Sequence, residues 1–387
     1  MAFVKGGERT FYLGALMGLV AFSIDVILPA LKAAMAHYGV PEAQGGLLVS
    51  LYFLGFALGQ FLFGPLADAF GRRPVLMGAL LGFLLAGSLT LFAPTFSLLL
   101  WARVFQGFFG AAFRVVATAA IRDLYRGEAM ARRLSQALFV LLLAPVLAPS
   151  LGVALLPLGF RAPFAFPVLL ALLVLLWGAL RFGETLPEER RRPLALGTLW
   201  EGLLLVLGDR RALLYTLALG ALFGVLYAYL SAAPLLYGRL GLSGLGFALA
   251  FGGTGLLQAL ANLLNGRTVE GLGLARSLRL SLLALLLALA FLPLTALFPS
   301  ALGLWLHLSL VLFLVTLAFP NAQARALEGL GRVAGLAASF TGFFSTLLAS
   351  LLATGVGQAS RGEPVPFALG LLLLGLLAFL AQRGAEA

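Results

Sequence analysis

The sequence predicts an all-α polytopic membrane protein with twelve transmembrane helices. Of its 387 residues, 61% are hydrophobic, whereas soluble domains have about 45–50%. Only 11% are charged, less than half of the usual quarter. The apolar residues form runs long enough to cross a bilayer, such as residues 278–298. These observations exclude a soluble enzyme, a secreted protein and a nucleic-acid-binding protein, because 41 charged residues cannot cover the surface of a soluble protein of this size.

The hydropathy pattern gives six spans on each side of a polar linker. The first six cover residues 11–34, 45–63, 75–93, 97–121, 134–157 and 163–181. The last six cover residues 212–236, 244–264, 277–298, 301–320, 333–357 and 365–382. The linker, residues 183–211, includes an interfacial helix expected over Leu194 to Leu207. We therefore predict an N-terminal six-helix bundle (1–182), the linker, and a C-terminal six-helix bundle (212–387).

The distribution of basic residues predicts the orientation. If the N-terminus is cytoplasmic, 20 of the 26 Lys and Arg residues fall in cytoplasmic segments and four fall on the other side. The other two, Arg103 and Arg114, lie inside span four. Loops rich in Lys and Arg stay in the cytoplasm. Both termini are therefore expected inside, and the net charge of +11 is an orientation signal.

The two halves contain a weak repeat. The loop after span two reads GPLADAFG (64–71), and the loop after span eight reads GRTVEGLG (266–273). Glycine, an acidic residue and glycine recur at the same offsets, 202 residues apart, and Gln60 matches Asn262 in the preceding spans. A repeat at equivalent places in two six-helix halves is typical of duplicated transporters.

Few ionisable residues lie inside the predicted spans. Away from the ends of the spans, Asp25 is the only acid, Arg103 and Arg114 are the only bases, and His307 is the only imidazole. Such residues are costly in a membrane and usually functional. Asp25 and Arg103 are both about 9–13 Å below the outer surface, counting 1.5 Å per residue, so they can share one cavity and pair. Arg114 follows Arg103 by eleven residues and projects from the same helix face.

This pair of residues suggests proton chemistry. Low dielectric favours the neutral form of a carboxylic acid, whereas a nearby guanidinium favours the carboxylate. A protein that alternately makes and breaks such a contact can load and release a proton. The alternative is a static ion pair that holds spans one and four together.

Several motifs resemble those of a known family. Residues 64–74 (GPLADAFGRRP) resemble the loop 2–3 signature of the major facilitator superfamily. Residues 103–107 (RVFQG) resemble its span-four motif, whose arginine is associated with proton transfer, and residues 144–152 (APVLAPSLG) are similar to its span-five antiporter motif. The resemblance implies the major facilitator fold of two pseudo-symmetric six-helix bundles, alternating access, and proton coupling through Asp25 and Arg103.

Shorter motifs resemble the Bcr/CflA subfamily of drug:proton antiporters: SIDVILPA (23–30), IRDL (121–124) and PNA (320–322). This resemblance implies a proton-coupled multidrug efflux transporter of the inner membrane that exports small amphipathic antimicrobial-type compounds. The expected partners are a small-molecule substrate, protons and the lipid bilayer, with no nucleic acid, no cofactor and no metal, in a monomeric protein. The alternative is a major-facilitator exporter of a metabolite such as an amino acid or sugar.

A membrane-embedded enzyme is not expected. Such an enzyme needs clustered carboxylates, a metal site or a nucleophile with its base. The spans hold one acid and one histidine, and the chain has no cysteine.

The loop after span two predicts a cytoplasmic gate. Gly64 and Gly71 permit a tight turn, and Arg72 is expected to pair with Asp68 or Asp123. The alternative is a solvated basic loop that only sets topology. In span five, Pro145 and Pro149 precede Gly152 in the antiporter-like motif, and each proline removes a backbone donor. They are expected to kink this helix, either for packing or for gating.

The sequence offers aromatic and polar side chains within the spans as candidates for a substrate cavity. They are Tyr52, Phe56, Gln106, Phe109, Phe113, Arg114, Tyr227, Tyr229, Gln258, Asn262 and His307. The alternative for the aromatic residues is contact with lipid or core, and for His307 a hydrogen bond between helices. One buried acid against two bases favours neutral, zwitterionic or weakly anionic substrates over dications.

Overall fold

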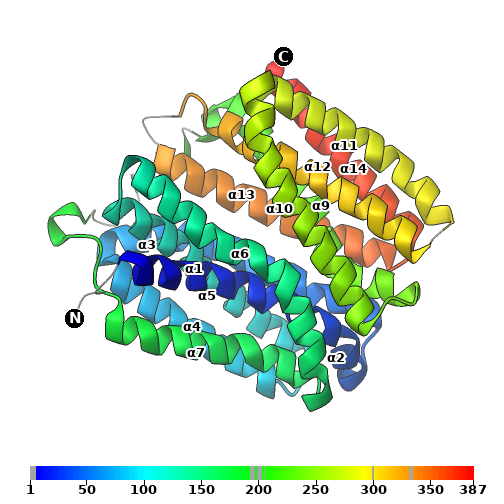
Figure 1. Cartoon of the computed structure of the whole chain (residues 1–387), viewed down its shortest axis with the longest axis horizontal. Helices are drawn as coiled ribbons and strands as arrows, with labels where there is room; N and C mark the ends of the chain where they lie inside the picture. Colours follow the sequence, from blue (N-terminus) through cyan, green and yellow to red (C-terminus); the bar gives the residue numbers. More distant parts are fainter. Residues whose placement is uncertain (1–5, 192–196, 198–202, 205, 299, 331–333) are drawn as a thin grey trace. The chain divides into compact units, whose positions relative to one another are not determined.

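A computed structural model describes residues 6–191, 197, 203, 204, 206–298, 300–330 and 334–387, and its long elements are all helices. Twelve of them are long and apolar enough to cross a membrane, which confirms the predicted number of spans (Figure 1). The first six are α1 Gly6–Asp25, α3 Leu47–Phe70, α4 Arg72–Phe92, α5 Phe96–Leu124, α6 Gly127–Leu155 and α7 Arg161–Arg181. The last six are α9 Arg210–Arg239, α10 Gly244–Leu272, α11 Leu274–Leu297, α12 Ala301–Leu327, α13 Ala334–Ser360 and α14 Pro364–Glu386.

Span one is interrupted, whereas the sequence predicts a continuous helix over residues 11–34. Helix α1 ends at Asp25, a short 3₁₀ helix η1 covers Leu28–Ala30, and α2 continues over Leu31–Tyr38. Pro29 explains the interruption, because it has no N–H to donate to the carbonyl of Asp25 four residues earlier. The break therefore occurs directly after the acidic residue of this span.

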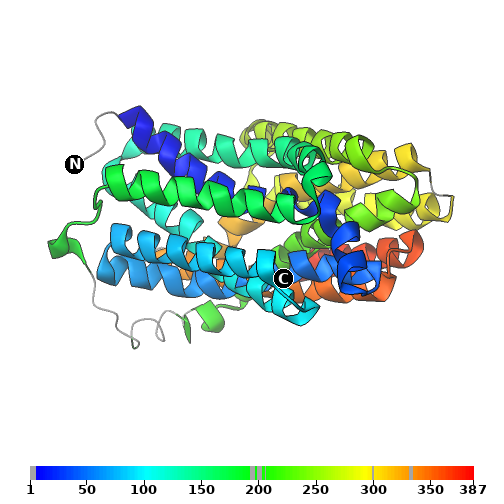
Figure 2. The same cartoon turned by 90° about the horizontal axis from the view of Figure 1, so that it is seen from below.

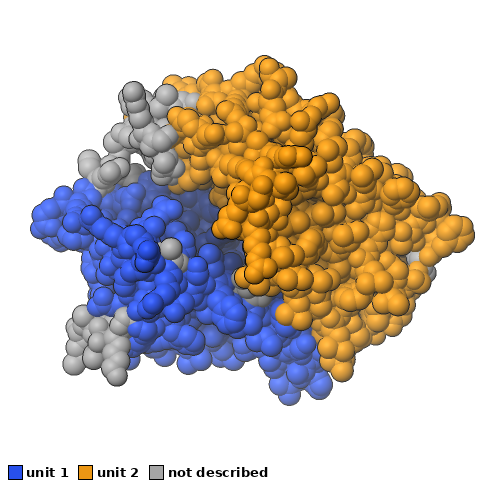
Figure 3. All heavy atoms as spheres, turned by 45° about the horizontal axis from the view of Figure 1, so that its top comes forward, with its two compact units in different colours: residues 1–40, 51–195 blue, residues 41–50, 196–387 orange. Residues whose placement is uncertain are grey.

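The chain divides into two compact units, coloured separately in Figure 3. Unit 1 comprises residues 1–40 and 51–195, and unit 2 comprises residues 41–50 and 196–387. The boundary at residue 195 falls inside the segment predicted as a linker. The expected interfacial helix over Leu194 to Leu207 lies mostly outside the described residues.

Unit 1 is a helical bundle in which α1 packs against α6, α5 and α7, and α4 packs against α5 and α7 (Figure 2). Close packing of α1 on α6 is possible because Gly14 and Gly18 face Val140 without a side chain of their own. The candidate functional side chains of unit 1 project from α1, α3 and α5 and from the turn between α3 and α4.

Unit 2 is a second bundle, in which α9 packs against α12, α13 and α14, and α11 packs against α12 and α14. The segment 41–50 also belongs to this unit. Its short helix η2 (Glu42–Gly46) packs on α9 and α13, and the Ser350 hydroxyl donates to the carbonyl of Ser50 at 2.7 Å.

Many large apolar side chains lie on the outside of the helices. Examples with at least 70% of the residue exposed are Leu85, Phe92, Leu158, Leu180, Leu263 and Phe298. Soluble proteins expose fewer large apolar side chains than this. It is the surface expected of helices that face the hydrocarbon of a bilayer.

The predicted repeat is present in the backbone. A single glycine joins α3 to α4 and another joins α10 to α11: Gly71 has φ +98° and Gly273, 202 residues later, has φ +75°. Residues with a β-carbon avoid these angles. Both halves therefore make the same one-residue turn.

Candidate functional site

Asp25 lies at the break in span one. It is the last residue of α1, and only 4% of it is exposed. Helix α6 approaches closely here, because a β-carbon at Gly152 would overlap the carbonyl oxygen of Val26 and lie 3.2 Å from Pro29 Cδ. Gly152 of the span-five motif thus allows α6 to pack on the segment directly after Asp25. Helix α6 runs through Pro145 and Pro149, and their role in gating stays a prediction.

Arg103 is buried in α5, with 1% of the residue exposed. Its Nη1 donates to Oε1 of Gln106 at 2.5 Å, one turn further along the helix. Its guanidinium carbon lies 4.6 Å from the centre of the Tyr52 ring on α3. The Ser23 hydroxyl of α1 in turn donates to the Tyr52 hydroxyl at 2.8 Å. Arg103 is thus connected to α1 by way of Tyr52 and Ser23, two residues before Asp25.

Helices α3 and α5 meet at glycines. A β-carbon at Gly55 would overlap the carbonyl oxygen of Val104, and one at Gly59 would overlap that of Phe108. From the other side, a β-carbon at Gly107 would overlap the carbonyl of Tyr52. We call this contact of Gly55, Gly59 and Gly107 the glycine seam. Backbones in direct contact leave little freedom in the relative position of the two helices.

The aromatic candidates of unit 1 are largely packed against one another. Phe56 is buried and stacks on Tyr52, with ring centres 6.5 Å apart. Phe113 is buried against Phe83 at 5.2 Å. Phe109 lies against α4, where a β-carbon at Gly82 would be 2.5 Å from its ring. Arg114 is exposed, although Arg103 eleven residues earlier is buried.

In unit 2 two tyrosines that the sequence singled out are buried. Tyr227 stacks on Phe223 at 5.6 Å. Tyr229 stacks on Phe251 at 5.6 Å, and its hydroxyl is 3.5 Å from that of Thr254 on α10. No charged side chain takes part in these contacts.

Helices α10 and α12 are joined by side-chain hydrogen bonds. The hydroxyls of Thr254 and Ser309 are 2.7 Å apart, and Thr316 donates to Gln258 at 3.4 Å. The amides of Asn265 and Asn321 donate to each other at 3.3 and 2.9 Å. We call these three pairs the polar seam. Asn262, chosen from the sequence, is exposed, and the sequence reading missed Asn265, which follows it by three residues.

His307 is hydrogen-bonded to the neighbouring helix α11. Its Nδ1 is 2.8 Å from the Thr295 hydroxyl, and its Nε2 is 2.8 Å from the carbonyl oxygen of Ala288. The contact with a carbonyl requires a proton on Nε2. This geometry matches the alternative stated above, a hydrogen bond between helices.

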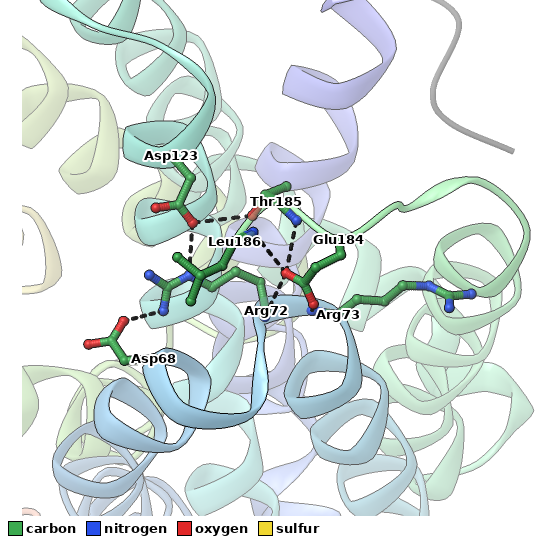
Figure 4. A network of polar contacts seen from close by, with 7 residues as sticks. All are labelled: Asp68, Arg72, Arg73, Asp123, Glu184, Thr185 and Leu186. Atoms are coloured by element: carbon green, nitrogen blue, oxygen red, sulfur yellow. Dashed lines mark hydrogen bonds and ion pairs between the residues drawn. The ribbon is translucent and has the colours of Figure 1, made fainter. Parts of the chain in front are cut away.

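A polar network surrounds the turn between α3 and α4 (Figure 4). Arg72 donates to Asp68 at 2.5 Å and to Asp123 at 2.9 Å, so both expected pairings are present. The Thr185 hydroxyl donates to the same oxygen of Asp123 at 3.3 Å. The α3–α4 network, as we call it, consists of Asp68, Arg72, Arg73, Asp123, Glu184, Thr185 and Leu186.

The turn itself is shorter than expected. Gly64 lies inside α3, which continues to Phe70, and Gly71 alone makes the turn. The expected turn at Gly64 is therefore wrong. Leu66, Ala67 and Ala69 favour a helix, and α3 continues through Pro65 to Phe70. The Asp68–Arg72 pair joins the end of α3 to the start of α4 across Gly71.

Glu184 completes the network, and the sequence reading missed it. One carboxylate oxygen accepts from the backbone N–H groups of Arg72, Thr185 and Leu186 at 2.8–3.0 Å, and the other accepts from that of Arg73 at 3.1 Å. Partial burial alone would raise the pKa of this carboxyl, but the four N–H groups outweigh it and lower the pKa. Glu184 thus caps the N-terminus of α4 from a segment more than a hundred residues away.

Comparisons with known proteins agree with this architecture. The chain matches the sequence model of the Major Facilitator Superfamily over residues 13–354. It is 32% identical to a bicyclomycin resistance protein homolog of Haemophilus influenzae, covering 92% of this chain and 91% of the relative. It is 31% identical to a chloramphenicol resistance protein of Pseudomonas aeruginosa, covering 86% and 82%. A crystal structure of a D-xylose–proton symporter has a TM-score of 0.77 at 17% identity, covering 97% and 96%, and shows a shared fold.

Proposed function

Because this chain belongs to the Major Facilitator Superfamily, we propose that it is a proton-coupled multidrug efflux transporter working by alternating access. Its substrates are small, amphipathic, antimicrobial-type compounds. The names of the two resistance-protein relatives support a drug-like substrate. One buried acid and two arginines inside the spans favour neutral, zwitterionic or weakly anionic compounds.

The observation that carries this proposal is the position of Asp25. It is a buried carboxyl group at the end of α1, next to a break in the helix. An ionisable side chain at such a depth is costly without a function, and a broken helix is where the backbone of a transporter can move. In the proposed cycle Asp25 carries the proton, Arg103 tunes its release, and substrate and proton bind in competition.

The α3–α4 network has a supporting role in the cycle. Its ion pairs and the helix cap by Glu184 stabilise one conformation of the cytoplasmic gate. The charge distribution along the loops supports an inner-membrane protein with both termini in the cytoplasm.

The test is transport by the purified protein in liposomes, with chloramphenicol as the probe. An imposed pH gradient should drive uphill movement of the drug in the wild type. Asp25→Asn should abolish uphill transport while exchange of drug down its own gradient continues. Asp209→Asn is the matched control, because Asp209 caps α9 and asparagine caps equally well.

Two outcomes would overturn parts of the proposal. Uphill transport by Asp25→Asn would remove the proton-carrier role from Asp25. Failure of the wild type to move chloramphenicol or bicyclomycin, together with pH-driven movement of an amino acid or sugar, would identify the metabolite exporter instead.

A further inference from the structure

Tyr52 lies between Arg103 and the last turn of α1. Tyr52 is completely buried. The face of its ring lies under the Arg103 guanidinium at 4.6 Å, and its hydroxyl accepts from Ser23 at 2.8 Å. The Ser23 oxygen also lies 2.7 Å from the carbonyl oxygen of Val20. Because a hydroxyl has one hydrogen, the Ser23–Tyr52 hydrogen bond persists when Ser23 donates to this carbonyl only if the Tyr52 hydroxyl is then the donor. One side chain of α3 therefore joins α5 to α1.

Helix α5 has a shape that holds Tyr52 in this place. A β-carbon at Gly107 would overlap the carbonyl oxygen of Tyr52, and one at Gly110 would lie 2.7 Å from its hydroxyl. Gly107 and Gly110 follow Arg103 on the same helix by about one turn and two turns. Helix α5 thus provides the cation above the ring and the space that the ring and its hydroxyl occupy.

The two ends of Tyr52 make different interactions. The ring face attracts the guanidinium through its quadrupole, whereas the hydroxyl makes a directional hydrogen bond to Ser23. Ser23 precedes Asp25 by two residues in the final turn of α1. A shift of this turn therefore displaces Tyr52, and with it the surface on which Arg103 rests.

We propose that Tyr52 is a positioning residue that couples the Asp25-bearing end of α1 to Arg103 on α5 through the Ser23–Tyr52 hydrogen bond. The proposal rests on the proposed function, because it takes Asp25 as the proton carrier. It replaces the substrate-cavity role expected for Tyr52, since the residue is fully buried between three helices.

The test compares variants that remove the hydrogen bond from either side. Tyr52→Phe and Ser23→Ala should each lower kcat of pH-driven chloramphenicol transport about tenfold with KM unchanged, the loss expected for one buried hydrogen bond. The double variant should be no slower than either single one, because both remove the same contact. Ser23→Thr keeps the hydroxyl and should retain the wild-type rate. Tyr237→Phe is the matched control, a buried tyrosine of α9 in the other unit.

Hydrogen exchange gives a second measurement that needs no transport. Exchange in residues 20–31, the end of α1 and η1, should become faster in Tyr52→Phe and Ser23→Ala and stay unchanged in Tyr237→Phe. Unchanged exchange in the first two variants would overturn the proposal, even where a variant is too unstable for transport assays.

The transport outcomes separate this proposal from the proposed function. Additive effects of the two single variants, or a raised KM with normal kcat, would overturn the role of Tyr52 alone. Absence of pH-driven transport by the wild type would instead overturn the proposed function, and this inference with it.

Discussion

The glycine seam of unit 1 and the polar seam of unit 2 are equivalent places in the repeat. Shifted by 202 residues, Gly107 corresponds to Ser309 and Tyr52 to Thr254. In unit 1 the backbones of α3 and α5 touch. In unit 2 the hydroxyls of Ser309 and Thr254 bridge α10 and α12 at 2.7 Å. The same pair of helices is therefore held once by backbone contact and once by side chains.

The difference between the two seams goes together with a difference in charge, because the buried Arg103 of unit 1 has a neutral counterpart in unit 2. The counterpart of Arg103 is Trp305, which donates its indole N–H to the carbonyl of Ala250 at 2.7 Å. A buried cation needs partners at defined distances, and helices in backbone contact provide such distances. Neutral hydroxyl and amide groups can exchange partners at lower cost. Rigid packing thus accompanies the charged groups of unit 1, and adaptable hydrogen bonds accompany the neutral groups of unit 2.

The strongest test of this comparison places the residue of one seam in the other. Gly107→Ser should lower the free energy of unfolding by more than about 3 kcal/mol, because its β-carbon overlaps the carbonyl of Tyr52. Ser309→Ala should cost only about 1 kcal/mol, the loss of one hydrogen bond. Thermal unfolding of the purified protein, followed by tryptophan fluorescence, measures both.

Gly78→Ser provides the control, because a β-carbon at Gly78 meets no atom within 4 Å. If Gly107→Ser were as stable as this control, backbone contact would not distinguish the two seams.

A second prediction compares arginines at the ends of the two bundles. The Arg72 side chain is 8% exposed and bonds to two carboxylates, and its counterpart at position 274 is leucine. Arg325 of unit 2 pairs with Glu328, which is half exposed, and contacts Tyr215 at 3.2 Å. Arg72→Ala should therefore cost about 2–3 kcal/mol, and Arg325→Ala about 1 kcal/mol. Equal losses in the free energy of unfolding for the two variants, measured by chemical denaturation, would contradict this difference between the two arginines.

Features that depend on hydropathy or on neighbours in the sequence could be predicted. The twelve spans follow from apolar runs, and the pairing of Arg72 with Asp68 follows from their closeness in the sequence, on the two sides of Gly71. Turns at Gly71 and Gly273 follow from the repeated glycines, although the expected turn at Gly64 is wrong. Each of these features depends only on residues that are close in the sequence or on the 202-residue spacing of the repeat.

Features that depend on how helices meet could not be predicted. Asn265 finds Asn321 while Asn262 is exposed, a choice set by the rotation of α10 against α12. Glu184 reaches α4 only through the fold of the chain between them. The break after Asp25 had a signal in Pro29, but proline is common in continuous transmembrane helices as well.

The smallest expected effect compares two acidic residues that are 202 residues apart, Glu184 and Glu386. Glu184 caps α4 with backbone N–H groups, whereas Glu386 accepts from the Tyr215 hydroxyl at 3.5 Å. Because the pKa of Glu184 is lowered from its ordinary 4.5, its carboxylate stabilises the folded state fully above pH 4.5. That contribution is lost as the pH falls below 4.5 through the lowered value.

Glu184→Gln should therefore cost about 0.5–1 kcal/mol at neutral pH, the lower part of the range for a helix cap, since the side chain is exposed to solvent. The difference from the wild type should narrow as the pH falls below 4.5, because the wild-type carboxylate then becomes protonated. Glu386→Gln should cost less than Glu184→Gln at neutral pH, because Glu386 accepts a single long hydrogen bond from Tyr215. Thermal unfolding between pH 3 and pH 7 measures both variants, and parallel curves for wild type and Glu184→Gln would show that the cap does not depend on the charge of Glu184.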